Sequence, residues 1–206
     1  NEKNGAYVLG EDIYMDDVRV CSIHDVALLG RHNLQNVCAA IAATWDIIDN
    51  NAAVIIKAVQ EYKGLPHRLE LVREVNGVKY FDDSFSTTPM STEVAMEAVK
   101  GEKIMILGGS DKGATFDELA DLIVSNKIKA VIQIGQIGPA IANALKDRGY
   151  TNIHDGGTTM QVIISQAANL AQNGDNVILS PACASFDMFK DYIDRGNQFH
   201  QAVNSL

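Results

Sequence analysis

Three polar segments after residue 80 follow apolar runs and carry side chains that could bind a ligand. They are residues 82–89 (DDSFSTTP), 108–113 (GGSDKG) and 180–186 (SPACASF). Their carboxylates, hydroxyls and lysine could hydrogen-bond to, or neutralise, a charged polar molecule. Each segment also has a simpler interpretation. Asp, Ser and Thr after a strand often cap the next helix, and Gly108-Gly109 could form a turn that leaves Lys112 in solvent.

Two common phosphate-binding patterns are absent from the sequence. Neither G-x-x-x-x-G-K-[ST] nor G-x-G-x-x-G occurs, so the chain carries no Walker A loop and no dinucleotide fingerprint. Cys183 could be proposed as a nucleophile, but no His has an evident pairing with it. A small buried thiol is therefore the favoured interpretation of Cys183.

Two further segments, residues 30–36 (GRHNLQN) and 66–70 (PHRLE), also combine polar groups at close spacing. Asn33 could cap a helix, or Asn33 and Asn36 could use their amides to hydrogen-bond a base or ribose. Arg68 could form a surface ion pair, or grip phosphate oxygens with its guanidinium fork. The residues alone leave both alternatives open.

From residue 68 onward, the hydrophobic pattern predicts an α/β domain. Strands at 69–75 and 78–81 flank Asn76-Gly77, which favours a tight hairpin. Apolar strands without alternation then alternate with amphipathic helices, which indicates a Rossmann-like domain with a mostly parallel sheet and an antiparallel edge hairpin. Ligands bind such sheets at the carboxyl ends of the strands, so we expect the three polar segments on one edge. The other strands are expected at 103–107, 130–134, 152–153 and 176–179, and the helices at 91–99, 116–126, 138–148, 159–172 and 187–202, with a Thr115/Glu118 capping box on the second helix.

The first 64 residues predict a less complete set of elements. Strand-like runs at 6–9 and 18–23 precede helices at 34–45 and 52–62. Two short strands are too few to close a core, and their edges would stay open. We therefore expect residues 1–64 to be the tail of a preceding domain, with a boundary near 63–67, in a chain cut from a longer protein.

Composition excludes several classes of protein. The net charge is −9, and basic residues do not gather on one stretch, which argues against nucleic acid as a partner. The three cysteines form no C-x-x-C pair, so a disulfide framework or a zinc site is not expected. No apolar run approaches the length that spans a bilayer, so no membrane partner is expected either. These features together predict a cytoplasmic protein.

The five polar segments together resemble the Mur ligase family. The matching sequences are GRHNLQN at 30–36, PHRLE at 66–70, DDS at 82–84, GGSDKG at 108–113 and SPACASFDMF at 180–189. The resemblance implies three domains: one for a UDP-sugar, a central ATPase domain with a P-loop, and a C-terminal Rossmann-like domain. Residues 1–64 then correspond to the incomplete end of the central domain and residues 65–206 to the C-terminal domain. The P-loop and the Mg²⁺ ligands are expected in the missing N-terminal domains, so no metal ligand is expected here.

The resemblance also implies a reaction. SPACASFD together with GGSDKG is typical of the members that add D-glutamate to UDP-N-acetylmuramoyl-L-alanine in peptidoglycan synthesis. In that reaction ATP phosphorylates the substrate carboxylate, and the amine of D-glutamate attacks the acyl phosphate. One alternative is a related ligase that adds another amino acid or a polyglutamate tail. Another is a non-catalytic binding module of the same fold. The 206 residues alone are expected to be inactive.

The same resemblance implies roles for individual residues. Lys112 and Arg68 are the expected catalytic residues, the first holding a carboxylate of D-glutamate and the second lying near the terminal phosphate. The other expected contacts are Asn33, Asn36 and Asp83 to the adenine nucleotide, the last through its ribose, and Thr87, Ser185, Phe186 and Tyr192 to D-glutamate.

The chain departs from the family in one segment. The usual D-S-K-A-T-N reads Asp83-Ser84-Phe85-Ser86-Thr87-Thr88 here, so Phe85 replaces a Lys and Thr88 replaces an Asn. One positive charge is thereby lost near the expected site, which changes the expected nucleotide or product contacts, while Asp83 and Thr87 remain in register with the family segment.

Overall fold

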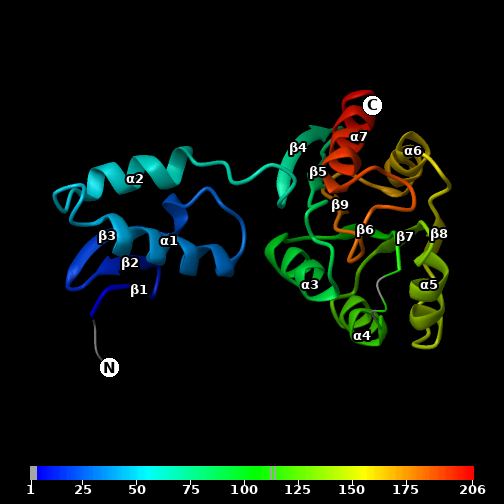
Figure 1. The fold of residues 1–206 in the computed structure, drawn as a ribbon, viewed down its shortest axis with the longest axis horizontal. Helices are drawn as coiled ribbons and strands as arrows, with labels where there is room; N and C mark the ends of the chain where they lie inside the picture. Colours follow the sequence, from blue (N-terminus) through cyan, green and yellow to red (C-terminus); the bar gives the residue numbers. More distant parts are fainter. Residues whose placement is uncertain (1–3, 112, 114) are drawn as a thin grey trace. The chain divides into compact units, whose positions relative to one another are not determined.

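The computed structural model describes residues 4–111, 113 and 115–206. The chain forms two compact units, which divide between Gly64 and Leu65. Figure 1 shows the elements of each unit. None of the helices in the described residues is both long and apolar enough to cross a membrane.

The first unit is a small antiparallel sheet covered by two helices (Figure 1). Ile13, in the central strand, is completely buried and packs in a cluster with Val37 and Ile41 of the first helix and with Trp45, which directly follows that helix. The elements are β1 (Ala6–Leu9), β2 (Asp12–Met15), β3 (Val18–Ser22), the short 3₁₀ helix η1 (Ile23–Asp25), α1 (Arg31–Thr44) and α2 (Ala52–Glu61).

The prediction that this region holds too few elements to close a core was wrong, because it missed β2. The strand has only four residues and begins with Asp12, a residue type that is depleted in strands. Pairing with strands on both sides overrides that local preference and directs Ile13 into the core.

Helix α1 begins earlier than predicted, at Arg31 instead of Leu34. Gly30 precedes it with φ 90°, a left-handed conformation that turns the chain into the helix. Asn33 therefore lies inside the first turn and is not the N-cap. Its Nδ2 donates to the carbonyl of Leu29 at 2.7 Å.

The second unit contains a six-stranded sheet in the order β4-β5-β9-β6-β7-β8. The hairpin pair β4 and β5 is antiparallel, and the other neighbours are parallel, which confirms the predicted α/β class. The strands are β4 (Glu70–Val75), β5 (Val78–Asp82), β6 (Lys103–Gly108), β7 (Ala130–Ile134), β8 (Ile153–Asp155) and β9 (Asn176–Leu179), and the helices are α3 (Pro89–Ala98), α4 (Asp117–Ser125), α5 (Gly138–Lys146), α6 (Met160–Leu170) and α7 (Tyr192–Asn204).

Helices cover both faces of this sheet. In β6, Ile104 and Ile106 pack into the cluster that includes α6 and α7, while Met105 and Leu107 pack into the cluster that includes α3, α4 and α5. All four side chains are fully buried. Burial on both faces explains why these strands read as continuous apolar runs.

Local signals predicted the hairpin turn but not every helix start. Asn76 and Gly77 adopt φ 52° and 77°, as a type I′ turn requires. The predicted Thr115/Glu118 capping box was wrong, because α4 begins at Asp117 after Phe116, without a side-chain cap.

Helix α7 starts five residues later than predicted, at Tyr192 rather than 187. The side chain of Asp191 caps it by accepting from Asp194 N at 2.8 Å. The preceding residues stay irregular because Asp187 hydrogen-bonds to another loop.

Candidate active site

The loops that follow β5, β6 and β9 meet at one edge of the sheet, which confirms the expectation for the three polar segments. Gly108 N, at the end of β6, donates to Pro181 O after β9 at 2.8 Å. Ala182 N donates to Ser86 O, after β5, at 3.1 Å. The three segments therefore form one continuous surface at the carboxyl ends of the parallel strands.

Gly109 allows two of these loops to approach closely. Its φ is 146°, and a Cβ there would lie only 2.0 Å from Ala184 O. The next residue, Ser110, donates its backbone N–H to that same carbonyl at 2.9 Å. The glycines therefore do more than form a turn, since a side chain at Gly109 would separate the loops.

Arg195, on α7, holds together the loops that follow β5 and β9. Its side chain is fully buried. Nε donates to Ser84 Oγ at 2.9 Å, Nη2 to Ser84 O at 2.9 Å, and Nη1 to Cys183 O at 3.1 Å. Burial lowers the pKa of Arg195 to about 10.

The sequence analysis gave Arg195 no role. A signal was nevertheless present, because Arg195, Phe199 and Val203 follow one another at a spacing of four on α7, and all three are buried. A charged residue at an apolar position of a helix is expected to be buried with its polar groups hydrogen-bonded.

Asp187 anchors the loop after β6. Its backbone N–H donates to Ser110 Oγ at 2.9 Å, and its carboxylate accepts from Gln136 N at 2.7 Å. The anchored loop carries Lys112, which lies outside the described residues, so the predicted contact of Lys112 with D-glutamate stays a prediction.

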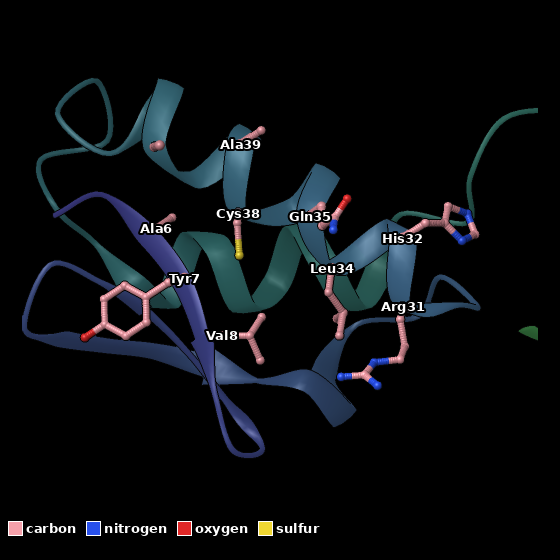
Figure 2. Close-up of a pocket in the computed structure, with 10 residues that line it drawn as sticks. Ala6, Tyr7, Val8, Arg31, His32, Leu34, Gln35, Cys38 and Ala39 are labelled. Carbon is pink, nitrogen blue, oxygen red and sulfur yellow. The ribbon is translucent and has the colours of Figure 1, made fainter. Parts of the chain in front are cut away.

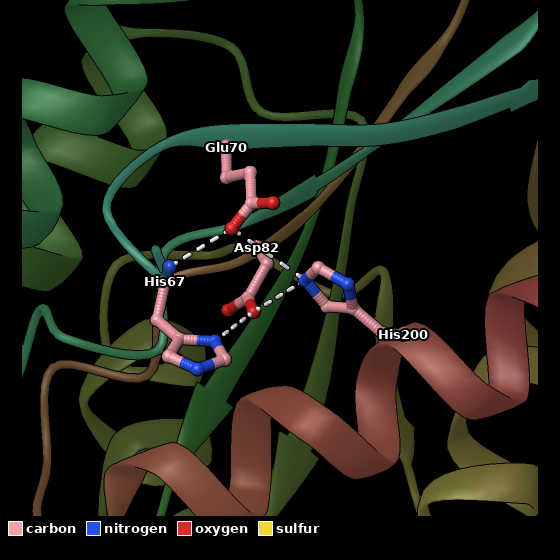
Figure 3. Close-up of side chains that lie close together, drawn as sticks. All are labelled: His67, Glu70, Asp82 and His200. Atoms are coloured by element: carbon pink, nitrogen blue, oxygen red, sulfur yellow. Dashed lines mark hydrogen bonds and ion pairs between the residues drawn. The ribbon is translucent and has the colours of Figure 1, made fainter. Parts of the chain in front are cut away.

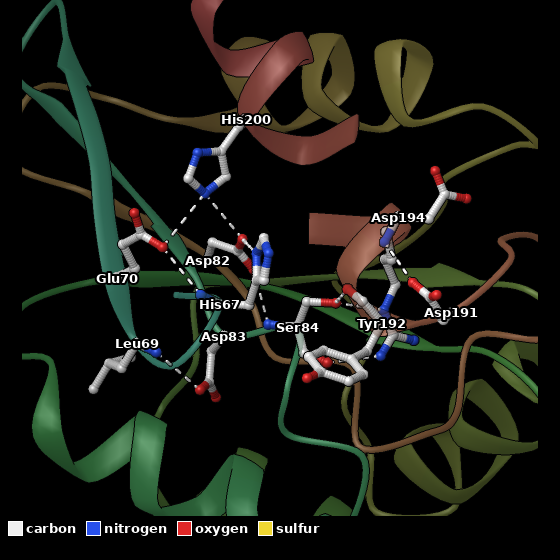
Figure 4. Close-up of polar contacts among 11 residues, drawn as sticks. His67, Leu69, Glu70, Asp82, Asp83, Ser84, Asp191, Tyr192, Asp194 and His200 are labelled. Carbon is white, nitrogen blue, oxygen red and sulfur yellow. Dashed lines mark hydrogen bonds and ion pairs between the residues drawn. The ribbon is translucent and has the colours of Figure 1, made fainter. Parts of the chain in front are cut away.

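Asp83 is almost fully buried between the hairpin and the loop after β9. One carboxylate oxygen accepts from Leu69 N at 3.1 Å and the other from Ser180 Oγ at 2.7 Å; Figure 4 shows Asp83 beside Leu69. Burial raises the pKa of Asp83 to about 6, against the opposing effect of these hydrogen bonds. Both oxygens are engaged in this conformation, and the contact with a ribose stays a prediction.

The guanidinium of Arg68 lies over the ring of Phe85. Its guanidinium carbon is 5.6 Å from the centroid of the Phe85 ring. Phe85 in turn packs edge-on against Tyr192, with centroids 5.2 Å apart. The residue that replaces the usual Lys thus gives Arg68 a cation–π partner.

The remaining residues predicted to contact D-glutamate differ in exposure. Thr87 is half-buried. Ser185 is buried and Phe186 is 70% exposed, although they are neighbours in the chain. The second departure from the family segment has a local explanation, since Thr88 caps α3 and accepts from the backbone of Ser91.

Asn33 and Asn36 belong to the first unit and bond to each other, with Asn36 Nδ2 3.1 Å from Asn33 Oδ1. Neither lines the pocket of about 750 Å³ that opens beside the start of α1 (Figure 2). The polar side chains of that pocket include Arg31, His32 and Gln35. The predicted nucleotide contact of the two asparagines stays a prediction.

In the second unit, two histidines and two carboxylates converge between the β4–β5 hairpin and α7 (Figure 3). His67 Nδ1 lies 2.7 Å and His200 Nε2 3.0 Å from the same oxygen of Asp82. Glu70 accepts from His67 N at 3.0 Å and lies 3.7 Å from His200 Nε2. The Asp82 carboxylate, 3.0 Å from His200 Nε2, raises the pKa of His200, while partial burial opposes the shift. The sequence analysis missed this cluster, because it gave PHRLE a role only for its arginine.

Comparisons with known proteins agree with this geometry. Residues 67–183 match a family described as "Mur ligase, glutamate ligase domain". A protein named UDP-N-acetylmuramoylalanine--D-glutamate ligase from Lachnospira eligens is 43% identical over 98% of this chain and 45% of its own length. A protein of the same name from Caldicellulosiruptor saccharolyticus is 38% identical over 99% of this chain and 45% of its own length.

Solved structures share the fold at low sequence identity. MurC from Thermotoga maritima matches 93% of this chain and 41% of its own, with a TM-score of 0.65 and 16% identity. MurF from Thermotoga maritima, solved in complex with ADP, matches 98% of this chain and 46% of its own, with a TM-score of 0.63 and 16% identity.

Proposed function

The chain belongs to the Mur ligase family, and from this premise we propose that it is the C-terminal part of an ATP-dependent ligase that adds D-glutamate to UDP-N-acetylmuramoyl-L-alanine. One observation carries the proposal. Relatives named for that reaction are 36–43% identical to this chain over nearly all of its length.

The chain spans less than half the length of these relatives. We assign the first unit to the end of the central ATPase domain and the second to the C-terminal domain. The P-loop, the UDP-sugar site and the ligands of Mg²⁺ belong, in this proposal, to the remainder of the enzyme. We also propose a cytoplasmic location, because the proposed reaction consumes ATP.

The residues of this chain would orient D-glutamate for attack on the acyl phosphate. The amine attacks the carbonyl carbon, and the tetrahedral intermediate collapses with loss of phosphate. D-Glutamate carries two carboxylates, so it needs a cation and fixed hydrogen-bond donors. Lys112 supplies the cation, Thr87 and Ser185 supply donors, and Tyr192, which packs against Phe85, is the further contact. The meeting of their loops at one sheet edge supports these roles.

Phe186 would lie at the mouth of the same site. Its ring is 70% exposed, so an apolar surface is available to cover the methylene groups of the amino acid. Ser185, directly before it, is buried and would face the polar end.

Arg68 would meet the terminal phosphate of ATP, with Asn33, Asn36 and Asp83 on the nucleotide. The Phe85 ring supports the Arg68 role, because a guanidinium held on an aromatic face loses less freedom when it binds phosphate. Asp83 would have to exchange its bond to Leu69 N or Ser180 Oγ for a ribose hydroxyl.

The test is amino-acid-dependent release of phosphate from ATP by the full-length protein with UDP-N-acetylmuramoyl-L-alanine. D-Glutamate should support turnover, and L-alanine, meso-diaminopimelate and L-glutamate should not. Turnover with one of the other amino acids would assign a different ligase. No amino-acid-dependent turnover at all would indicate a binding module of the same fold.

A further inference from the structure

We propose that His67, Glu70, Asp82 and His200 form a binding site for one divalent transition metal ion, and that Zn²⁺ fits the donors best. The inference concerns the second unit alone and is independent of the proposed ligase reaction.

The spacing of the donor atoms suits a tetrahedral ion. All four ligand atoms lie within 4.8 Å of one another. Three of the six pairwise separations are 2.7 Å, 3.0 Å and 3.7 Å. Ligands at the usual Zn–N and Zn–O distances stand about 3.4 Å apart at the corners of a tetrahedron. Shifts of well under an ångström at each side chain would therefore place an ion between them.

The donors are held by separate parts of the fold. His67 precedes β4, Glu70 begins β4, Asp82 ends β5, and His200 comes from α7 (Figure 3). One oxygen of Asp82 accepts from Ser84 N at 2.9 Å, which turns the other oxygen toward both imidazoles. Such outer hydrogen bonds orient metal-binding carboxylates.

Charge also favours a cation here. The carboxylate of Asp82 is fully buried, and the groups facing its inner oxygen are the two imidazoles. With neutral imidazoles, Asp82 and Glu70 carry two negative charges, and the buried guanidinium of Arg195, which interacts with Asp82, offsets one of them, so the cluster stays negative and attracts a cation. The alternative to a bound ion is a metal-free cluster in which each imidazole donates a hydrogen bond to Asp82.

The donor set selects the class of metal. Mg²⁺ and Ca²⁺ prefer oxygen ligands, whereas imidazole nitrogens suit Zn²⁺ and its neighbours. Four protein ligands leave no open position, as in structural zinc sites. A bound ion would fasten α7 to the hairpin and hold the turn that carries Arg68.

The test is metal binding by the purified, tag-free 206-residue chain after treatment with a chelator. Zn²⁺ titrated in competition with a chromophoric chelator should bind at one equivalent and raise the melting temperature. Co²⁺ should give the intense visible absorption of a tetrahedral complex. Glu70→Gln and His200→Gln should each weaken binding at least about tenfold.

A histidine outside the cluster provides the matched control. His24 has a side chain that is 71% exposed and lies 3.6 Å from Glu11, so His24→Gln should leave the affinity unchanged. Failure to bind Zn²⁺, a weak octahedral Co²⁺ spectrum, or unchanged affinity in Glu70→Gln would overturn the proposal. Glu70→Gln decides even if His200→Gln fails to fold, because glutamine keeps an oxygen that can accept from His67 N.

Discussion

Gly196 lies within α7, and replacing it with alanine should destabilise the second unit. Gly to Ala in an open helix stabilises by about 1 kcal/mol. Here the added Cβ would lie 2.2 Å from His67 Nδ1 and 2.7 Å from Asp82 Oδ2. Those two atoms are hydrogen-bonded to each other at 2.7 Å, so neither can move away freely. The clash should therefore reverse the usual sign of the substitution.

The magnitude of the Gly196→Ala effect follows from two costs, the overpacking of the interior and the loss of the His67–Asp82 hydrogen bond. Forcing a methyl group into a packed interior costs about 1–3 kcal/mol. Breaking the bond between His67 and a charged carboxylate costs about 1.5–3 kcal/mol more. After subtraction of the gain in helix propensity, the net loss should be about 1.5–5 kcal/mol.

Hydrogen exchange of peptides from α7 measures this loss locally, which matters because the chain has two units. Exchange in Gly196→Ala should be faster at least about 12-fold, the equivalent of about 1.5 kcal/mol. Asn197→Ala is the matched control, since Asn197 is the exposed neighbour on the same helix and should exchange at an equal or slower rate. Exchange in Gly196→Ala that is unchanged or slowed would refute the reasoning.

Three further outcomes are expected. Gly109→Ala should destabilise the protein by about 2–5 kcal/mol in urea unfolding, because a backbone oxygen lies 2.0 Å from the new Cβ. The control Gly113→Ala, whose new Cβ has nothing within 4 Å, should lose only about 1–2 kcal/mol from its positive φ, and equal losses in the two variants would contradict this reasoning. Arg195→Lys should lower the free energy of unfolding by about 2–4 kcal/mol, because one ammonium group cannot replace the three hydrogen bonds of the guanidinium and a buried carbonyl loses its donor. A melting temperature within 1–2 °C of wild type, about half a kcal/mol, would argue against the proposed role of Arg195 in holding the loops. In the full-length enzyme, Lys112→Ala should raise the KM for D-glutamate about 10- to 100-fold and the KM for ATP far less, and equal increases would contradict the proposed contact.

Local patterns were sufficient for much of the fold. The Asn76-Gly77 turn, the apolar strands and the helical spacing each depend on residues close in sequence, and all appear in the structure. The meeting of the three polar loops followed as well, because parallel strands carry their carboxyl ends to the same edge. Boundaries were less predictable. Helix α7 starts late because Asp187 bonds to Ser110, a residue far away in the chain.

The sequence by itself determined the α/β class, the family and the loops that carry the candidate site. Only the tertiary structure decided how those loops are held and what lies beside them. The buried bonds of Arg195 and the convergence of His67 and His200 on Asp82 join residues that are distant in sequence. Helical spacing can mark Arg195 as a buried position, but it does not identify these partners, because they depend on how α7 packs against the sheet. The histidine–carboxylate cluster therefore became visible only in three dimensions.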